Sequence, residues 1–222
     1  MTFPNLLLRE ESTRDWSPLG LLPIDAFLDA APIAPLQIAV DLFASGRWRE
    51  TELRCRRTPS GVIVLPRLGR RAAIEPGMAP ALYRLRVDSE PYIPRFRTDR
   101  DGREFQVPAY NDTNPPPALP GRFDMLPLDP GPAYPYPSEM SVLRGTVREP
   151  NGAPIRDATI SYAEGLVRAM SDERGCFALG LRRAPAAGQI VVDIVHHRTN
   201  RAVSVNINLP QDLQTNQVVT IP

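Results

Sequence analysis

The residues best suited to acid–base, nucleophilic or metal chemistry are few in this sequence and poorly spaced for it. The two histidines, His196 and His197, are adjacent, and neighbours in a strand point to opposite faces, so they cannot easily share a metal ion or a proton. At the end of a strand candidate they are most simply turn residues. The cysteines, Cys55 and Cys176, are expected to be buried and reduced. A catalytic thiol would need a nearby histidine, which the sequence does not show.

Known catalytic and metal-binding motifs are also missing from the sequence. It contains no Gly-x-Ser-x-Gly elbow, His-Glu-x-x-His pair, P-loop or Cys-x-x-Cys motif. Residues 99–104 (Asp-Arg-Asp-Gly-Arg-Glu) resemble a calcium loop only superficially, because they lack the third oxygen ligand before the glycine and the distant glutamate. We therefore expect no catalytic residue, no metal and no cofactor, in a protein that is not an enzyme.

Arginine is the second chemically distinctive residue type. All 26 basic residues are arginine, and the formal net charge is +1. Clusters occur at 54–57, 67–71 and 95–103, where they either form a solvated face paired with Asp and Glu or contact an acidic partner. A net charge near zero, without an aromatic stacking platform, argues against a nucleic-acid partner.

The elements that position these residues read as β-strands. In residues 35–110, strand candidates are 36–43, 51–56, 61–65, 81–88, 92–97 and 103–108, and Asp101-Gly102 between the last two predicts a hairpin. Proline, at 26 residues, is more than twice its usual share, which favours short strands, sheet edges and extended connectors.

Residues 140–222 predict a second β domain of roughly seven strands. Hydrophobic residues alternate through 142–147, 158–162 and 203–209, and Gly, Asn and Asp turns separate the runs. In the turn 171–175, Asp172 is expected to bond the turn amides, and Gly175 is expected to supply a positive φ.

Three segments of this region follow the pattern of a known family. They are Gly145-Thr146-Val147, then 152–160 (Gly-Ala-Pro-Ile-Arg-Asp-Ala-Thr-Ile), and 172–177 (Asp-Glu-Arg-Gly-Cys-Phe). Together they resemble the carboxypeptidase regulatory-like (transthyretin-like) β-sandwich family over 141–222, and 35–110 looks like a degenerate copy of the same fold. The resemblance implies two small antiparallel prealbumin- or immunoglobulin-like β-sandwiches in an all-β protein. Domains of this family are binding or scaffolding modules.

The two remaining ranges are expected to be extended. Residues 1–34 read as an N-terminal arm, in which 25–31 favour one or two helical turns with Ile24, Phe27 and Leu28 on one face. Residues 111–139 read as a stiff proline-rich linker.

Apolar side chains in the arm and the linker are the candidate partner-binding residues. A purely solvated spacer would not need them, so they dock either on the chain's own domains or on a neighbouring subunit. The candidates are Phe27, Leu28, Phe123, Met125, Leu126, Tyr134 and Tyr136.

These features together predict a non-catalytic structural or adaptor protein. The N-terminus lacks a basic region and a long apolar core, which indicates cytoplasmic synthesis without a signal peptide, and no run is long enough to span a membrane. The expected partners are other protein subunits, most specifically those of a phage-like or contractile injection particle. The alternatives are a module that binds surface carbohydrate, and an accessory domain of an enzyme on another chain.

Overall fold

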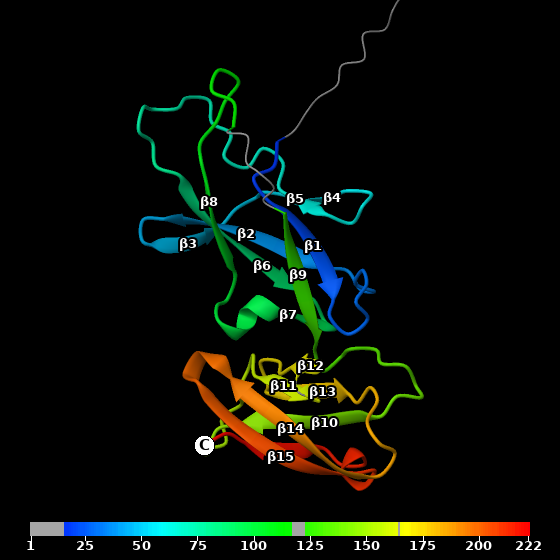
Figure 1. Ribbon diagram of the computed structural model, residues 1–222. Coiled ribbons are helices and arrows are strands. Elements are labelled where there is room, and N and C mark those ends of the chain that lie inside the picture. Colours follow the sequence, from blue (N-terminus) through cyan, green and yellow to red (C-terminus); the bar gives the residue numbers. More distant parts are fainter. Residues whose placement is uncertain (1–15, 117–122, 164) are drawn as a thin grey trace, which may run out of the picture.

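The protein is all-β and forms two sandwiches stacked end to end (Figure 1). The structure, a computed structural model, describes residues 16–116, 123–163 and 165–222. Each sandwich has its own core: one cluster of buried side chains includes Leu85 and Leu128, and the other includes Ile160 and Leu179. The all-β sandwich-type fold expected from the alternation of apolar residues is confirmed.

The N-terminal sandwich consists of two sheets. One sheet has the order β4-β5-β1-β9-β7 and the other has the order β3-β2-β6-β8. The strands are β1 (Gly20–Asp25), β2 (Gln37–Ala44), β3 (Arg47–Glu50), β4 (Arg56–Arg57), β5 (Ile63–Val64), β6 (Ala81–Asp88), β7 (Tyr92–Pro94), β8 (Arg103–Val107) and β9 (Phe123–Pro130).

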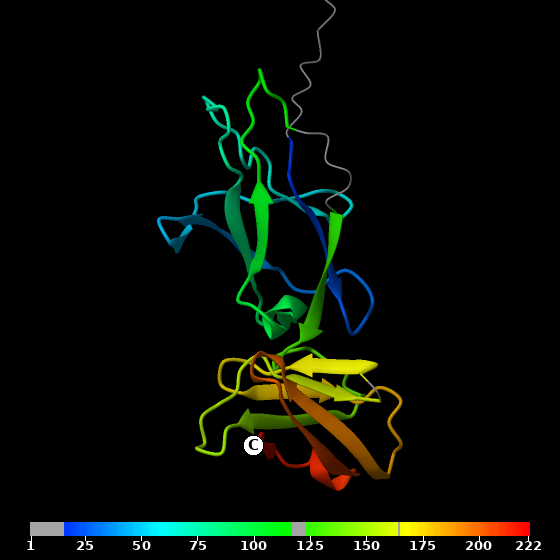
Figure 2. The same ribbon diagram turned by 60° about the vertical axis from the view of Figure 1, so that its left-hand side comes forward.

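Two of these strands come from the ranges expected to be arm and linker. β1 pairs in parallel with β9, from Gly20 opposite Phe123 to Asp25 opposite Leu128. Buried residues alternate along β1, and Leu126 and Leu128 of β9 enter the same core. The extended backbone of both segments suits a strand, and burial of their apolar side chains makes them part of the sandwich (Figure 2).

The predicted hairpin around Asp101-Gly102 is wrong. β7 ends at Pro94, and a short 3-10 helix, η1 (Arg95–Thr98), follows it. β7 then pairs with β9, whereas β8 pairs with β6 in the other sheet. The turn signal is real, but it connects strands of two different sheets, which a local pattern cannot distinguish from a hairpin.

The helical turns expected at 25–31 are reduced to a single turn, in which the Asp29 amide donates to the Asp25 carbonyl at 2.8 Å, and no helix forms. The Asp25 carboxylate accepts hydrogen bonds from the amides of Phe27 and Leu28, at 2.8 and 3.0 Å, and Asp29 adopts a φ of 54°. These bonds have the geometry of a helix N-cap, but the left-handed conformation of Asp29 ends the turn before a helix can continue. As a result Phe27 is buried, whereas the adjacent Leu28 is exposed.

The C-terminal sandwich follows its predicted strands closely. Its sheets have the orders β13-β10-β16 and β12-β11-β14-β15. The strands are β10 (Val142–Arg148), β11 (Thr159–Tyr162), β12 (Val167–Met170), β13 (Cys176–Gly180), β14 (Gly188–His196), β15 (Arg201–Leu209) and β16 (Gln217–Thr220). Pairing is antiparallel except between β10 and β16.

The turn before β13 has the predicted construction. Asp172 accepts hydrogen bonds from the amides of Arg174 and Cys176 at 2.9 and 2.8 Å, and Gly175 has a φ of 75°. A Cβ on Gly175 would overlap the carbonyl oxygen of Val147. Glycine is therefore required both for the backbone conformation and for the close approach of β10.

Candidate functional site

The open edge of β9 is the most distinctive surface of the N-terminal sandwich. β1 covers one side of β9 along 123–128, but β7 pairs only with 128–130 on the other side. In the described part of the chain, no strand pairs with this second side of residues 123–127. The amide of Ala26 donates to the Leu128 carbonyl at 2.9 Å. Alternate residues point their backbone groups in opposite directions, so those of Phe123 and Met125 face the uncovered side.

The side chains of Phe123 and Met125 make this edge apolar. They are 51% and 62% exposed, whereas Leu126 and Leu128 are buried in the core. An uncovered strand with exposed apolar residues is a ready template for pairing with another chain.

A cleft of about 470 Å³ lies beside this edge, where the two sandwiches meet. We call it the arginine cleft, because Arg95, Arg100, Arg103 and Arg168 line it together with Met125, Leu126, Pro127 and His197. Arg95 makes two hydrogen bonds, at 3.0 and 2.7 Å, to the fully buried Asp129. Arg103 contacts the partly exposed Asp124 at 2.6 Å.

Two arginines of this cleft have spare hydrogen-bonding capacity. Among the residues that the structure describes, Arg100 and Arg168 form no ion pair, and the Nε of Arg168 is buried without a hydrogen-bond partner. A buried donor without a partner carries a desolvation cost that a bound acceptor would remove. The arginines favour a carboxylate in this cleft, and Asp99, which also lines it, opposes them.

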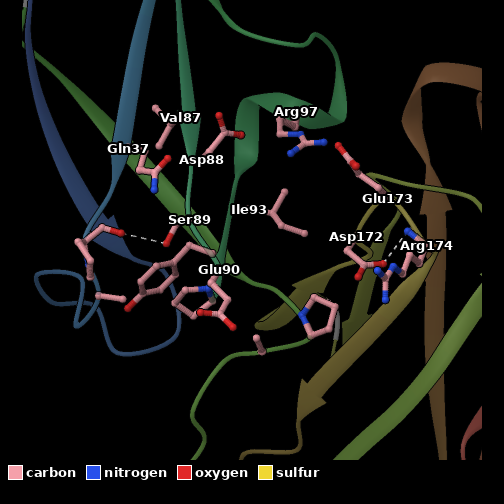
Figure 3. A pocket seen from close by; sticks show the side chains of 16 residues that line it. Gln37, Val87, Asp88, Ser89, Glu90, Ile93, Arg97, Asp172, Glu173 and Arg174 are labelled. Carbon is pink, nitrogen blue, oxygen red and sulfur yellow. Dashed lines mark hydrogen bonds between the residues drawn. The ribbon is translucent and has the colours of Figure 1, made fainter. Parts of the chain in front are cut away.

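A second cleft at the junction has mixed charge, because Arg97 and Arg174 line it together with four acidic residues. It has a volume of about 800 Å³, and its acidic side chains are Asp88, Glu90, Asp172 and Glu173. Figure 3 shows Arg97 and Glu173 facing each other across the two sandwiches. The carboxylate of Asp172 is already bonded to its own turn. No group of three or more potential metal-ligating side chains occurs within the described ranges, here or elsewhere.

An ion-pair cluster joins the two sandwiches between these clefts. Asp157, which is 1% exposed, lies 2.9 Å from Arg97 of η1 and 3.5 Å from Arg198. Arg198 also contacts Asp101 at 2.9 Å and donates to the Arg97 carbonyl. Sequence reasoning missed this cluster because nothing local marks Asp157 as buried. The φ of 58° there suits aspartate.

Burial dominates the electrostatics of Asp157. Desolvation raises the pKa of its carboxyl, despite the opposing effect of Arg97, Arg198 and Arg156. At Asp101 the balance is reversed, because the hydrogen bond from Arg198 lowers the carboxyl pKa. The two acids of one cluster therefore respond oppositely to pH.

This difference gives a prediction about Asp157→Asn. A raised native pKa means that the contribution of Asp157 to stability is present below the unfolded-state pKa and is lost as pH rises through the native pKa. We expect the variant to be at least as stable as wild type at pH 7. We expect this relative advantage to shrink as pH falls toward 4, measured by urea denaturation at each pH.

Asp101→Asn is the matched control, because a lowered native pKa gives the opposite trend. Its cost should be largest at pH 7 and should fall as pH drops through the native pKa. If the advantage of Asp157→Asn instead grew on acidification, the ionised carboxylate of Asp157 would be more stable in the folded state than in the unfolded state. That result would contradict the effect of its burial.

The structure distributes the seven candidate partner-binding residues over three environments. Tyr134 and Leu126 are in the N-terminal core with Phe27, whose ring also lies under the guanidinium of Arg182 at 4.2 Å. The Tyr136 hydroxyl donates to the Ala178 carbonyl at 2.9 Å. Phe27 and Tyr136 thus contact the chain's own C-terminal sandwich. Leu28, Phe123 and Met125 are exposed, and the last two lie together on the β9 edge.

The histidines and cysteines hold no arrangement typical of catalysis. His196 ends β14, where its Nδ1 lies 2.8 Å from Thr199 Oγ1. Cys55 and Cys176 are free and half-buried, and desolvation raises the pKa of both thiols. Within the ranges described, no helix has the length and apolar character needed to cross a membrane.

Comparisons with known proteins give no family. No protein-family model matches the sequence. No curated protein matches it either. Among solved structures, the Bacillus anthracis TIE protein is similar with a TM-score of 0.28 and 10% identity over 93% of this chain and 33% of that one. The chain thus spans a third of that protein's length, and a likeness at this TM-score adds nothing to the description of the fold or the function.

Proposed function

We propose that the chain is a non-catalytic structural or adaptor subunit of a larger protein assembly. The uncovered edge of β9, with exposed Phe123 and Met125, is the observation that carries the proposal. A partner segment that added a strand there would gain backbone hydrogen bonds along the edge and would bury both side chains. A phage-like or contractile injection particle is the specific setting that we propose.

The junction between the sandwiches supports this role. Arg198 of the C-terminal sandwich pairs with Asp101 and donates to the Arg97 carbonyl, and Tyr136 and Arg182 add contacts across the same boundary. A subunit that contacts several neighbours fixes their relative positions only if its own domains do not move against each other. Firmly joined domains meet this requirement better than a flexible pair.

We also propose that the C-terminal sandwich is a carboxypeptidase regulatory-like domain. Gly145 and Gly175 of the motif are glycines at which a Cβ would overlap neighbouring backbone, at Gln217 and Val147 respectively. The motif residues therefore serve the packing of β10, β13 and β16, consistent with a scaffold.

Sedimentation of the native protein tests the proposed role. In lysates of the source cells, we expect the wild-type chain in high-mass fractions. We expect the double variant Phe123→Ser/Met125→Ser to move to the fractions of the free protein, because it loses the apolar contacts of the edge. In the high-mass fractions, hydrogen exchange at amides 123 and 125 should also be slower than in the isolated protein.

Leu166→Ser is the matched control. Leu166 is 86% exposed but lies in the other sandwich, so its loss should leave sedimentation unchanged. A wild-type chain that sediments only as the free protein would refute the proposal. Equal displacement by the control and the edge variant would show that the β9 edge is not the contact.

A further inference from the structure

A groove distinct from the two clefts at the junction opens between the two sheets of the N-terminal sandwich, on the β5 side of β1. Its volume is about 390 Å³, and Pro23, Leu36, Ile38, Leu53 and Ile63 form its apolar surface. None of these residues belongs to the β9 edge.

The apolar surface is open because the sheets are not closed at this point. β4 and β5 are only two residues long, and residues 51–55 run past them without belonging to a strand. Leu36, Ile38 and Leu53 pack against the core but remain only half-buried. These three aliphatic side chains are partly in contact with water. An apolar ligand that covered them would gain the hydrophobic free energy of their burial.

The groove is bordered by cations alone. Arg54, Arg56 and Arg57 line it, and no acidic residue does. Arg54 and Arg57 are exposed, and neither forms an ion pair with a residue in the described part of the chain. Guanidinium groups bind carboxylates in a two-pronged geometry, which favours a carboxylate over other polar groups at this border.

We propose that this groove binds amphipathic monocarboxylates of the fatty-acid class. The apolar chain enters between the sheets along Leu36, Ile38 and Leu53, and the carboxylate is held by Arg54 and Arg57. The volume lies within the range of about 300–1,000 Å³ that is typical of small-molecule sites. The site is separate from the β9 edge and does not depend on the role proposed for that edge.

Cys55 provides a direct measurement of occupancy. It lines the groove, whereas Cys176 lies in the other sandwich and serves as an internal control. Both thiols are free, and burial raises the pKa of Cys55 to about 11. We expect decanoate to slow the alkylation of Cys55 by N-ethylmaleimide at least fivefold, as measured by mass spectrometry, while the rate at Cys176 stays the same.

Charge dependence separates this site from general detergent binding. Decyltrimethylammonium has the same chain with the opposite charge and should not protect Cys55. The variant Arg54→Gln/Arg57→Gln should raise the decanoate concentration needed for half-maximal protection at least tenfold. Arg47→Gln/Arg49→Gln, which removes the same charge from the exposed strand β3, should leave it unchanged.

Three outcomes would overturn the proposal. The first is no protection of Cys55 by decanoate up to about 1 mM, the weak end of specific binding. The second is equal protection of both cysteines, which indicates a general effect on the fold. The third is protection that survives the loss of Arg54 and Arg57 or is matched by the cationic analogue.

Discussion

Replacing Asp25 by alanine is expected to lower the free energy of unfolding by about 4 kcal/mol, because buried hydroxyl groups lose their acceptor. The carboxylate of Asp25 is fully buried. It accepts hydrogen bonds from the hydroxyls of Tyr92 and Tyr134, each at 2.7 Å, and from the amides of Phe27 and Leu28. The substitution would leave both hydroxyls without their acceptor and would open the turn after β1.

The position of Asp25 explains the size of this effect. It ends β1, Tyr92 begins β7, and Tyr134 follows β9, so one carboxylate joins three segments distant in sequence. Burial and the nearby carboxylate raise the pKa of Tyr92 to about 12 and also raise that of Tyr134, so both remain donors at neutral pH.

Urea denaturation monitored by circular dichroism would measure the loss. Tyr134→Phe removes one donor to the carboxylate and should cost about 2 kcal/mol, a typical value for a hydrogen bond to a charged group. Tyr92→Phe should cost at least as much, because it also removes the acceptor of the Ile33 amide. Asp112→Ala is the control, because the Asp112 side chain is 88% exposed and its pair with Arg70 should contribute less than about 1 kcal/mol. A loss at Asp25 no larger than at Asp112 would show that the buried network does not stabilise the fold.

Replacing Arg95 by glutamine is expected to cost about 3 kcal/mol, because the substitution leaves Asp129 as a buried carboxylate without its cation. Asp129 is fully buried, and within the described ranges Arg95 supplies the two hydrogen bonds to its side chain. We expect a loss of unfolding free energy at the lower end of the range for buried ion pairs, because the Arg95 side chain is 38% exposed. The variant should also weaken partner binding at the adjacent β9 edge.

Arg103→Gln is a matched control within the same cleft. Arg103 and Asp124 form a short pair, but their side chains are 45% and 41% exposed. Removing that arginine should cost less than about 1 kcal/mol in the same denaturation experiment. The double variant Arg95→Gln/Asp129→Asn should recover part of the loss, because the unpaired charge is then absent. Equal effects at Arg95 and Arg103 would contradict the role of burial.

Much of the C-terminal sandwich could be predicted from the sequence because its signals are local. The alternation of Val203, Val205 and Ile207 predicts a strand with one buried face, and β15 has that pattern. The turn at Asp172 and Gly175 was also predicted with its mechanism. A side chain that bonds an amide two residues ahead, or a glycine at positive φ, depends on few distant atoms.

The candidate site was predicted only in part, because exposure depends on distant segments. Phe123, Met125 and Leu126 were equivalent in the sequence, but Leu126 lies on the face of β9 that packs on the core, whereas Phe123 and Met125 lie on the opposite, exposed face. The arginine clusters were visible, yet nothing indicated that Arg95 would pair with Asp129 while Arg168 would keep a buried Nε without a partner.

The sparse chemistry of the sequence, with two adjacent histidines and two distant cysteines, already limits what to expect of this protein. Together with period-two alternation, it determined the all-β class and the expectation of a non-catalytic role. Only the tertiary structure decided that parts of the arm and the linker pair as β1 and β9. It also decided that Asp25 and Asp157 are buried where segments distant in sequence meet. The physical reason is separation along the sequence. Alternation and turns depend on neighbouring residues, whereas the burial of a side chain depends on segments that can lie about a hundred residues away.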